Sequence, residues 1–86
     1  MFQAPLPKIP RGHARRGDDA DLLALADAVR TARTEAGLSQ ANLALVCGVG
    51  RDTVIALENG RSGVSLGPAL RVLKGVGLTL APVSRR

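Results

Sequence analysis

The 86-residue sequence contains no tryptophan or tyrosine, one phenylalanine and one cysteine. With Cys47 alone, the chain cannot form an internal disulfide framework or a paired-thiol metal site, which suits a reducing cytoplasm. Because Phe2 is the only aromatic residue, any core must consist of aliphatic side chains, as in a compact helical bundle. No stretch approaches the roughly 18 consecutive apolar residues of a membrane span, and no apolar run follows the N-terminal positive charges as in a signal peptide.

Acidic side chains are missing from both ends of the chain. Residues 1–17 carry four basic residues, residues 85–86 add two arginines, and residues 18–84 are nearly neutral, with 6 basic and 7 acidic side chains. This distribution favours a polyanionic partner such as nucleic acid, and it fits a solubilising tail equally well. We expect the single His13 to be solvated. Without a cluster of metal ligands or a phosphate-binding glycine loop, the sequence predicts no catalytic residue, metal or cofactor, and so no enzyme.

The chain divides into three parts. Residues 1–18 contain Pro and Gly without apolar periodicity, which predicts a disordered basic arm. Residues 19–77 show helical periodicity, and residues 78–86 combine a β-prone segment with a basic tail. Within the middle part, apolar spacing and capping residues predict four helices. These expected helices span residues 20–36, 40–46, 51–58 and 66–76.

Polar and glycine residues mark the expected ends of these helices. Asp18 or Asp19 can cap the first helix, Ser39 the second and Ser65 the fourth, because their side-chain oxygens accept hydrogen bonds from free helical N–H groups. Glycine at positions 37, 48 and 60 marks the ends of the first three, where a left-handed residue is easiest without a Cβ.

The segment from Ser39 to Arg61 has the spacing of a helix-turn-helix. In this unit one helix lies on a DNA backbone and the next enters the major groove. The small Ala44 suits the point where the two helices cross, and Val54 and Leu57 would hold the third helix on the first two. The residues expected to face outward are Arg51, Asp52, Ile55 and Ala56.

The pattern LSQ…LA…GV…TV…LENG, over about residues 22–76, resembles the Xre/Cro-type helix-turn-helix family. The resemblance implies an all-α, lambda-repressor-like domain in which Gln40 braces a phosphate. It also implies a partly buried structural ion pair between Arg33 and Glu58 that locks the recognition helix to the scaffold. The predicted DNA-binding residues are Ser39, Gln40, Gly50, Arg51, Asp52, Thr53, Ile55, Ala56, Asn59 and Arg61.

Three residues depart from the family pattern. Gly50 replaces the usual Ser or Thr cap, which removes a hydroxyl that would contact a phosphate. Ile55 replaces a common Ser, and we expect it either to pack against thymine methyl groups or to be an exposed Ile without a role. Ala56 is too short to reach a base by hydrogen bond. Arg51 is therefore left as the main direct reader, bidentate to guanine O6 and N7.

The remaining polar groups have two interpretations each. Asp52 either accepts from a cytosine amino group or stabilises the helix N-terminus and orients Arg51, and Thr53 can bond a phosphate. The basic arm either enters an adjacent minor groove, or binds a protein partner or nothing. We expect Cys47 to behave as a small buried hydrophobe.

The segment Leu78–Val83 predicts a short β-strand that pairs with its copy across a two-fold axis. A single strand leaves both edges unpaired, and pairing would satisfy one edge and bury Leu78 and Leu80; a loose tail is the alternative. The run LRVLKGVGLTL resembles HipB-type antitoxins, which carry an intersubunit sheet after four helices. The residues of this dimer strand are Leu78, Thr79, Leu80, Ala81 and Val83.

The resemblance implies a cytoplasmic, homodimeric transcriptional repressor that binds an inverted-repeat operator in double-stranded DNA and autoregulates its operon. It further implies a HipA-like kinase toxin as partner. Two alternatives remain open from the sequence. One is a free-standing Xre-family repressor without a toxin, and the other is a protein-interaction adaptor.

Overall fold

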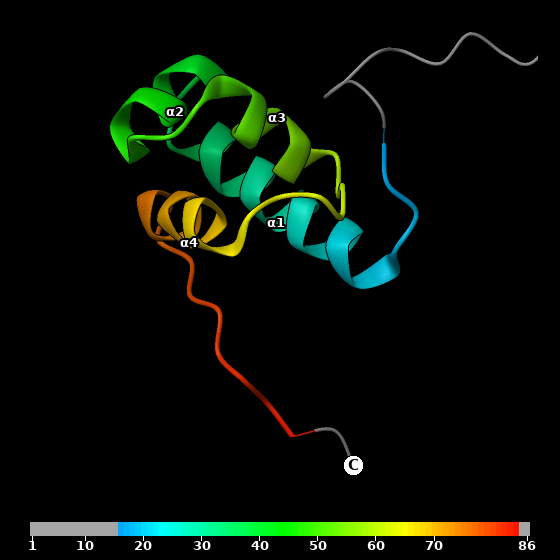
Figure 1. Cartoon of the computed structure of the whole chain (residues 1–86). Helices are drawn as coiled ribbons and strands as arrows, with labels where there is room; N and C mark the ends of the chain where they lie inside the picture. Colours follow the sequence, from blue (N-terminus) through cyan, green and yellow to red (C-terminus); the bar gives the residue numbers. More distant parts are fainter. Residues whose placement is uncertain (1–15, 85–86) are drawn as a thin grey trace, which may run out of the picture.

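The computed structural model describes residues 16–84 as a bundle of four helices. They are α1 (Ala20–Glu35), α2 (Gln40–Cys47), α3 (Arg51–Glu58) and α4 (Leu66–Gly75), arranged as in Figure 1. Each boundary agrees with the expected one to within one residue. The all-α helix-turn-helix fold predicted from the sequence is therefore confirmed. The predicted disordered arm covers residues 1–18, and residues 1–15 of it lie outside the part of the chain that the structure describes.

Side-chain caps begin the first two helices. An Asp19 Oδ1 atom accepts a hydrogen bond from the Leu22 N–H at 3.0 Å, and Ser39 Oγ accepts one from the Asn42 N–H at 3.0 Å. These bonds satisfy N–H groups that have no partner within the helix. The expected cap at Ser65 is wrong in this respect, because α4 begins there without a side-chain hydrogen bond, as α3 does at Gly50.

All four helices end in the same way. A glycine with positive φ follows each helix, at positions 37, 48, 60 and 77. The N–H of the residue after each glycine bonds back five residues, as from Leu78 to the Leu73 carbonyl at 2.8 Å. This is the Schellman arrangement, which occupies helix carbonyls that would otherwise lack a donor. The short connections in the sequence follow directly from these tight ends.

The core lies where the four helices meet, and it is entirely aliphatic. Helix α3 packs against each of the other three helices, and α2 also packs against α4. This central position makes α3 the best-fixed element of the domain. The buried core residues shared by the four helices are Val29, Leu43, Ala44, Val54, Leu57, Ala69, Val72 and Leu73.

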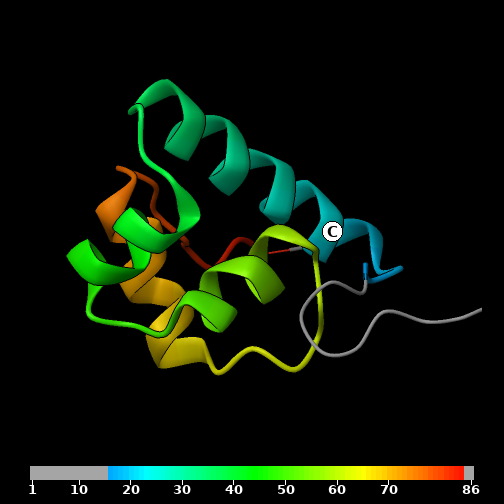
Figure 2. The same cartoon turned by 90° about the horizontal axis from the view of Figure 1, so that it is seen from above.

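The C-terminal segment leaves the bundle on the side away from α2 and α3 (Figures 1 and 2). Leu78 still packs against the core, whereas Leu80 and Val83 are 52% and 83% exposed. Within residues 16–84 the single chain contains no β-strand. The strand pairing expected for residues 78–83 requires a second copy and stays a prediction.

Candidate nucleic-acid interface

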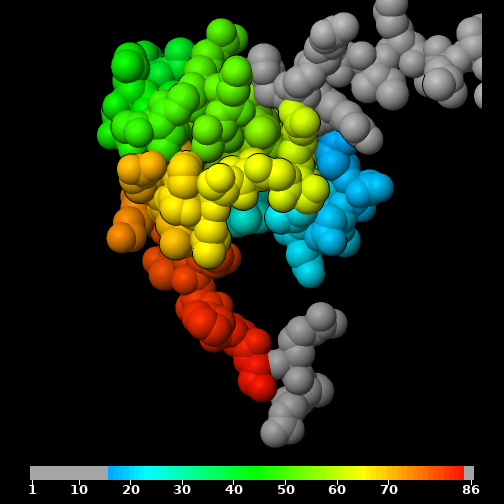
Figure 3. All heavy atoms as spheres, viewed as in Figure 1, coloured from blue at the N-terminus to red at the C-terminus, as the bar shows by residue number. Residues whose placement is uncertain are grey.

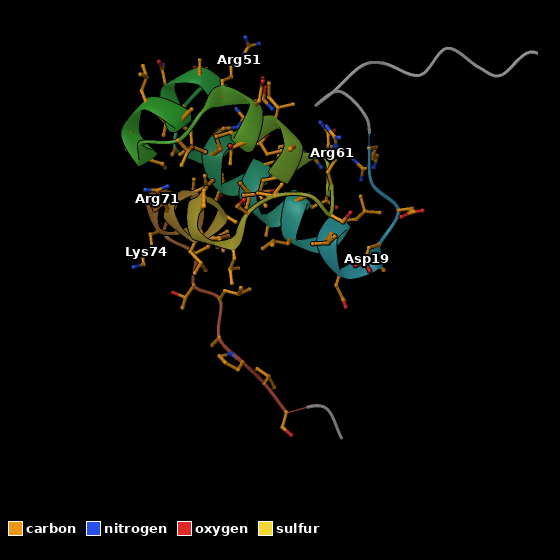
Figure 4. All side chains as sticks on the ribbon, viewed as in Figure 1. Asp19, Arg51, Arg61, Arg71 and Lys74 are labelled. Carbon is orange, nitrogen blue, oxygen red and sulfur yellow. The ribbon has the colours of Figure 1, made fainter. Side chains whose placement is uncertain are left out.

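The start of helix α3 is exposed to solvent, whereas most of its remaining residues are buried in the domain. Arg51 and Asp52 are exposed, and Thr53 and Ala56 are half-buried. In Figure 4 the Arg51 side chain points away from the helices, on the side of the molecule formed by α2 and α3. An exposed helix N-terminus with a free-standing arginine fits the major groove, where guanine presents two acceptors. The geometry therefore leaves the Arg51 side chain accessible on this face.

Ile55 does not lie on this outer face, and the expectation that its side chain faces outward is wrong. Its exposed fraction is 7%. The sequence argument treated α3 as packed on one side only. In the structure α3 contacts α1, α2 and α4, so it is buried over a wider part of its circumference than a helix packed on one side. This wider buried surface includes Ile55 as well as Val54. The α3 surface open to a duplex is correspondingly narrower.

Glu58, at the end of α3, is the one charged residue among the buried residues of the described chain, with an exposed fraction of 2%. Arg33 donates to both of its carboxylate oxygens, from Nε at 2.6 Å and from Nη2 at 3.0 Å. Gln40 Nε2 donates a third hydrogen bond at 3.0 Å. A buried carboxylate is tolerated only when such partners replace its hydration. The cluster therefore ties α3 to both α1 and α2.

Gln40 thus has a structural partner that the sequence did not indicate. The resemblance implied a phosphate contact for its side chain. Its Nε2 group carries two hydrogens, and the bond to Glu58 uses one of them. The contact with Glu58 therefore orients the amide and uses one of its two hydrogens. Sequence spacing cannot reveal this bond, because the two residues are 18 positions apart in the chain.

Two further hydrogen bonds close the end of α3, and one closes the end of α1. Arg30 Nη1 donates to the Glu58 carbonyl oxygen at 3.2 Å, and Arg33 Nη1 donates to the Leu38 carbonyl oxygen at 2.8 Å. Asn59 Nδ2 donates to the Ile55 carbonyl oxygen at 3.0 Å. These bonds use guanidinium and amide donors to satisfy backbone acceptors at helix ends. The bond from Arg30 ties the C-terminal end of α3 to α1.

A hollow of about 380 Å³ runs beside the outer face of α3, between this helix and the loop that precedes α4. It brings together three of the predicted DNA-binding side chains from α3 with Arg61 from the loop. The residues that line it are Asp52, Thr53, Ala56, Arg61, Gly63, Val64, Ser65 and Pro68.

The remaining predicted residues lie around this face. Ser39 and Gly50 are exposed at the starts of α2 and α3, next to the expected path of a duplex backbone. Cys47 is half-buried and packs against the core, and this burial raises the pKa of its thiol. A protonated thiol in such a position behaves as a small apolar side chain.

The fold and the exposed face of α3 define a helix-turn-helix DNA-binding regulator. The chain belongs to the helix-turn-helix domain family, whose model matches residues 24–85. No curated protein sequence matches it. Among residues 16–84, none of the helices combines the length and the apolar character needed to traverse a lipid bilayer.

Solved structures share this fold. The restriction-modification controller protein C.AhdI from Aeromonas hydrophila is 34% identical, with a TM-score of 0.62, over 71% of this chain and 92% of that one. A HipA–HipB–O2–O3 complex matches at 21% identity with a TM-score of 0.67, over 81% and 99% of the two chains. A complex of a HipB variant with an O2 20-mer matches at 23% identity with a TM-score of 0.67, over 81% and 97%. The two HipB matches show similarity of fold alone.

Proposed function

We propose that the protein is a sequence-specific transcriptional repressor that reads an operator through the first turn of α3. The observation that carries this proposal is the contrast within one short helix. Its C-terminal half is clamped by the Glu58 cluster, while Arg51 at its start stands in solvent. Because the helix backbone that carries Arg51 is already held rigidly, binding DNA would cost little backbone conformational entropy. Arg51 would form the bidentate contact with a guanine.

The outer residues around Arg51 complete the proposed interface. Thr53 and Ser39 would bond phosphates, and the amide of Gln40, held by Glu58, would present its second hydrogen to the backbone. Asn59 and Arg61 lie where α3 ends, so we place them against the adjacent backbone. Such phosphate contacts fix the register of a protein on the duplex but carry no sequence information.

The proposed active form is a homodimer on an inverted repeat. Two copies related by a two-fold axis would place their α3 helices about 34 Å apart, one turn of DNA. The segment after α4, which carries the exposed Leu80 and Val83, leaves the bundle on the side away from α3, so a partner copy seated there would not cover the reading face.

We further propose that the protein is the cytoplasmic antitoxin of a HipBA-like pair, binding a HipA-like kinase toxin and autoregulating its operon. Its support is the shared fold with HipB over nearly the whole HipB chain, together with the apolar C-terminal extension. The 34% identity to C.AhdI favours a second candidate, a free-standing regulator without a toxin. Co-purification with the product of a neighbouring kinase-like gene would support the antitoxin, and its absence when both are expressed together would favour the second candidate.

The DNA-binding proposal is tested by selecting bound fragments from a random duplex pool. A repressor enriches an inverted repeat and binds it about 10³-fold or more tightly than unrelated duplexes at physiological salt. Its affinity falls steeply as salt rises, because bound phosphates release counterions. A pool without enrichment would instead indicate a protein-interaction adaptor that has lost the DNA role.

A further inference from the structure

The chain before α1 is bound to the end of the recognition helix. The Gly17 N–H donates to the Asn59 carbonyl oxygen at 2.8 Å. A Cβ at position 17 would lie 2.0 Å from the Gly60 carbonyl oxygen and 2.8 Å from its carbon. Both are backbone atoms, which cannot rotate away as a side chain can. Only glycine allows this approach of the two backbones.

Gly60 is enclosed from the other side as well. A Cβ there would lie 2.8 Å from Leu23 Cδ2 and 3.3 Å from the Leu22 carbonyl oxygen, both in the first turn of α1. The backbone after α3 therefore passes between α1 and Gly17, and all three are fixed together. Figure 3 shows this arrangement, in which the blue residues at the start of the described chain lie against the yellow-green residues near position 60.

This contact places Arg16 beside the loop that follows α3. A hollow of about 330 Å³ is lined by two arginines, one aspartate and small loop residues. It adjoins the hollow along α3, since Arg61 and Gly63 line both. The residues that line it are Arg16, Gly17, Asp18, Arg61, Ser62 and Gly63.

We propose that Arg16 and Arg61 form a binding site for a DNA backbone phosphate, continuous with the surface read by α3, and that the Gly17–Gly60 contact holds Arg16 in place. Two arginines lining one small hollow supply positive charge and several N–H donors, which suit the charge and the acceptor oxygens of a phosphate. The Asp18 carboxylate lowers the positive potential of the site and so limits its strength. The residues before Gly17 add Lys8, Arg11 and Arg15 and no acid, so the contact fixes where this basic segment joins the domain.

The inference rests on the proposed DNA-binding function, and the test compares four variants of the full chain. Arg16→Ala removes one guanidinium, and Gly17→Ala keeps every charge but displaces the backbone by its Cβ. Asp18→Asn removes the opposing charge and leaves the Asp19 cap intact. Gly67→Ala is the matched control, because its Cβ would meet nothing within 4 Å. Dissociation constants are measured against salt on the selected operator and on an unrelated duplex.

Arg16→Ala should weaken binding several-fold on both duplexes and reduce the slope of log K against log salt by about 0.9 per protomer. Gly17→Ala should weaken binding to a similar degree, Asp18→Asn should strengthen it, and Gly67→Ala should not change it. Base preference should be unaltered in all four, because a phosphate contact reads no base.

The outcomes distinguish failure of the proposed phosphate site from failure of the proposed DNA-binding function. A wild-type chain that selects no duplex refutes the proposed function. A wild-type chain that binds its operator, with the affinity and salt slope of Arg16→Ala unchanged, refutes the phosphate site alone. Loss of affinity in Arg16→Ala without loss in Gly17→Ala refutes the glycine contact as the device that positions the arginine. Each variant is checked for an unchanged helical circular dichroism spectrum.

Discussion

In the proposed function, base reading depends on Arg51. Replacing it with alanine removes the only long exposed side chain in the first turn of α3 without touching the core. We expect Arg51→Ala to lose about 1–3 kcal/mol of discrimination at one base pair in each half-site, because the bidentate guanine contact is gone. Competition binding against operators substituted at every position measures this. Arg71→Ala, which removes an exposed arginine of α4, should keep the wild-type profile. An unaltered base preference for Arg51→Ala would remove it from the reading role.

Glu58 is the residue on which the position of α3 depends. Arg33→Met leaves the Glu58 carboxylate buried, with Gln40 as the one remaining side-chain donor among residues 16–84. Removing one partner of a buried ion pair costs about 3–5 kcal/mol, because the other charge is left without compensation. We therefore expect the free energy of unfolding to fall by that amount in urea titrations.

The control for this prediction is Arg71→Met, an arginine removal on the exposed side of α4, which should change stability by no more than about 0.5 kcal/mol. Adding Glu58→Gln to Arg33→Met should recover part of the loss, since a neutral amide is cheaper to bury than a carboxylate. Equal stability of the two single arginine variants would show that the buried pair contributes nothing.

At the scale of elements, local signals in the sequence predicted the helices well. The Asp19 and Ser39 caps and the glycines after α1, α2 and α3 act within a few residues, so they can be recognised without knowledge of the fold. The burial of Ile55 and the Gln40–Glu58 bond depend on which helices surround α3. The approach of Gly17 to Gly60 joins segments more than 40 positions apart. Such contacts are set by tertiary packing, which no local pattern in one sequence encodes.

The packing of α4 on α2 gives a prediction at the same scale. A Cβ at Gly75 would lie 2.3 Å from Cys47 Sγ and 3.6 Å from Leu43 Cδ1, so a side chain at this position would have to displace the Cys47 thiol. We expect Gly75→Ala to destabilise the fold by about 1–3 kcal/mol through overpacking. Gly67→Ala, also in α4 but in open space, should instead stabilise it by up to about 1 kcal/mol.

A double-mutant cycle identifies the cause of the Gly75 effect. In a Cys47→Ala background the sulfur is absent, and Gly75→Ala should then cost little. Free energies of unfolding for the four chains of the cycle give the coupling. Purely additive costs would show that the clash with Cys47 is not what excludes a side chain at position 75.

At the scale of the whole molecule, the C-terminal segment is the part of the chain on which we expect the proposed homodimer to depend. Leu78 belongs to the folded monomer, because its N–H closes the end of α4 and its side chain packs on the core. The residues after it leave apolar side chains in solvent, at Leu80 and Val83. Burying such a side chain is worth about 1.5–3 kcal/mol, and two copies would each contribute. We therefore expect the proposed dimer to depend on residues 79–84 and not on Leu78.

Deleting residues 79–86 should convert the dimer to a monomer that keeps its helical content, because the four helices and the closing bond at Leu78 are intact. Operator affinity should fall sharply, since two half-sites would no longer be bound by one linked pair of α3 helices. Sedimentation equilibrium measures the assembly, and circular dichroism measures the fold. Replacing Arg85 and Arg86 with alanine retains residues 79–84 and should keep the dimer, which separates loss of the strand from loss of charge. A truncated chain that still sediments as a dimer would place the two-fold interface on the helices instead.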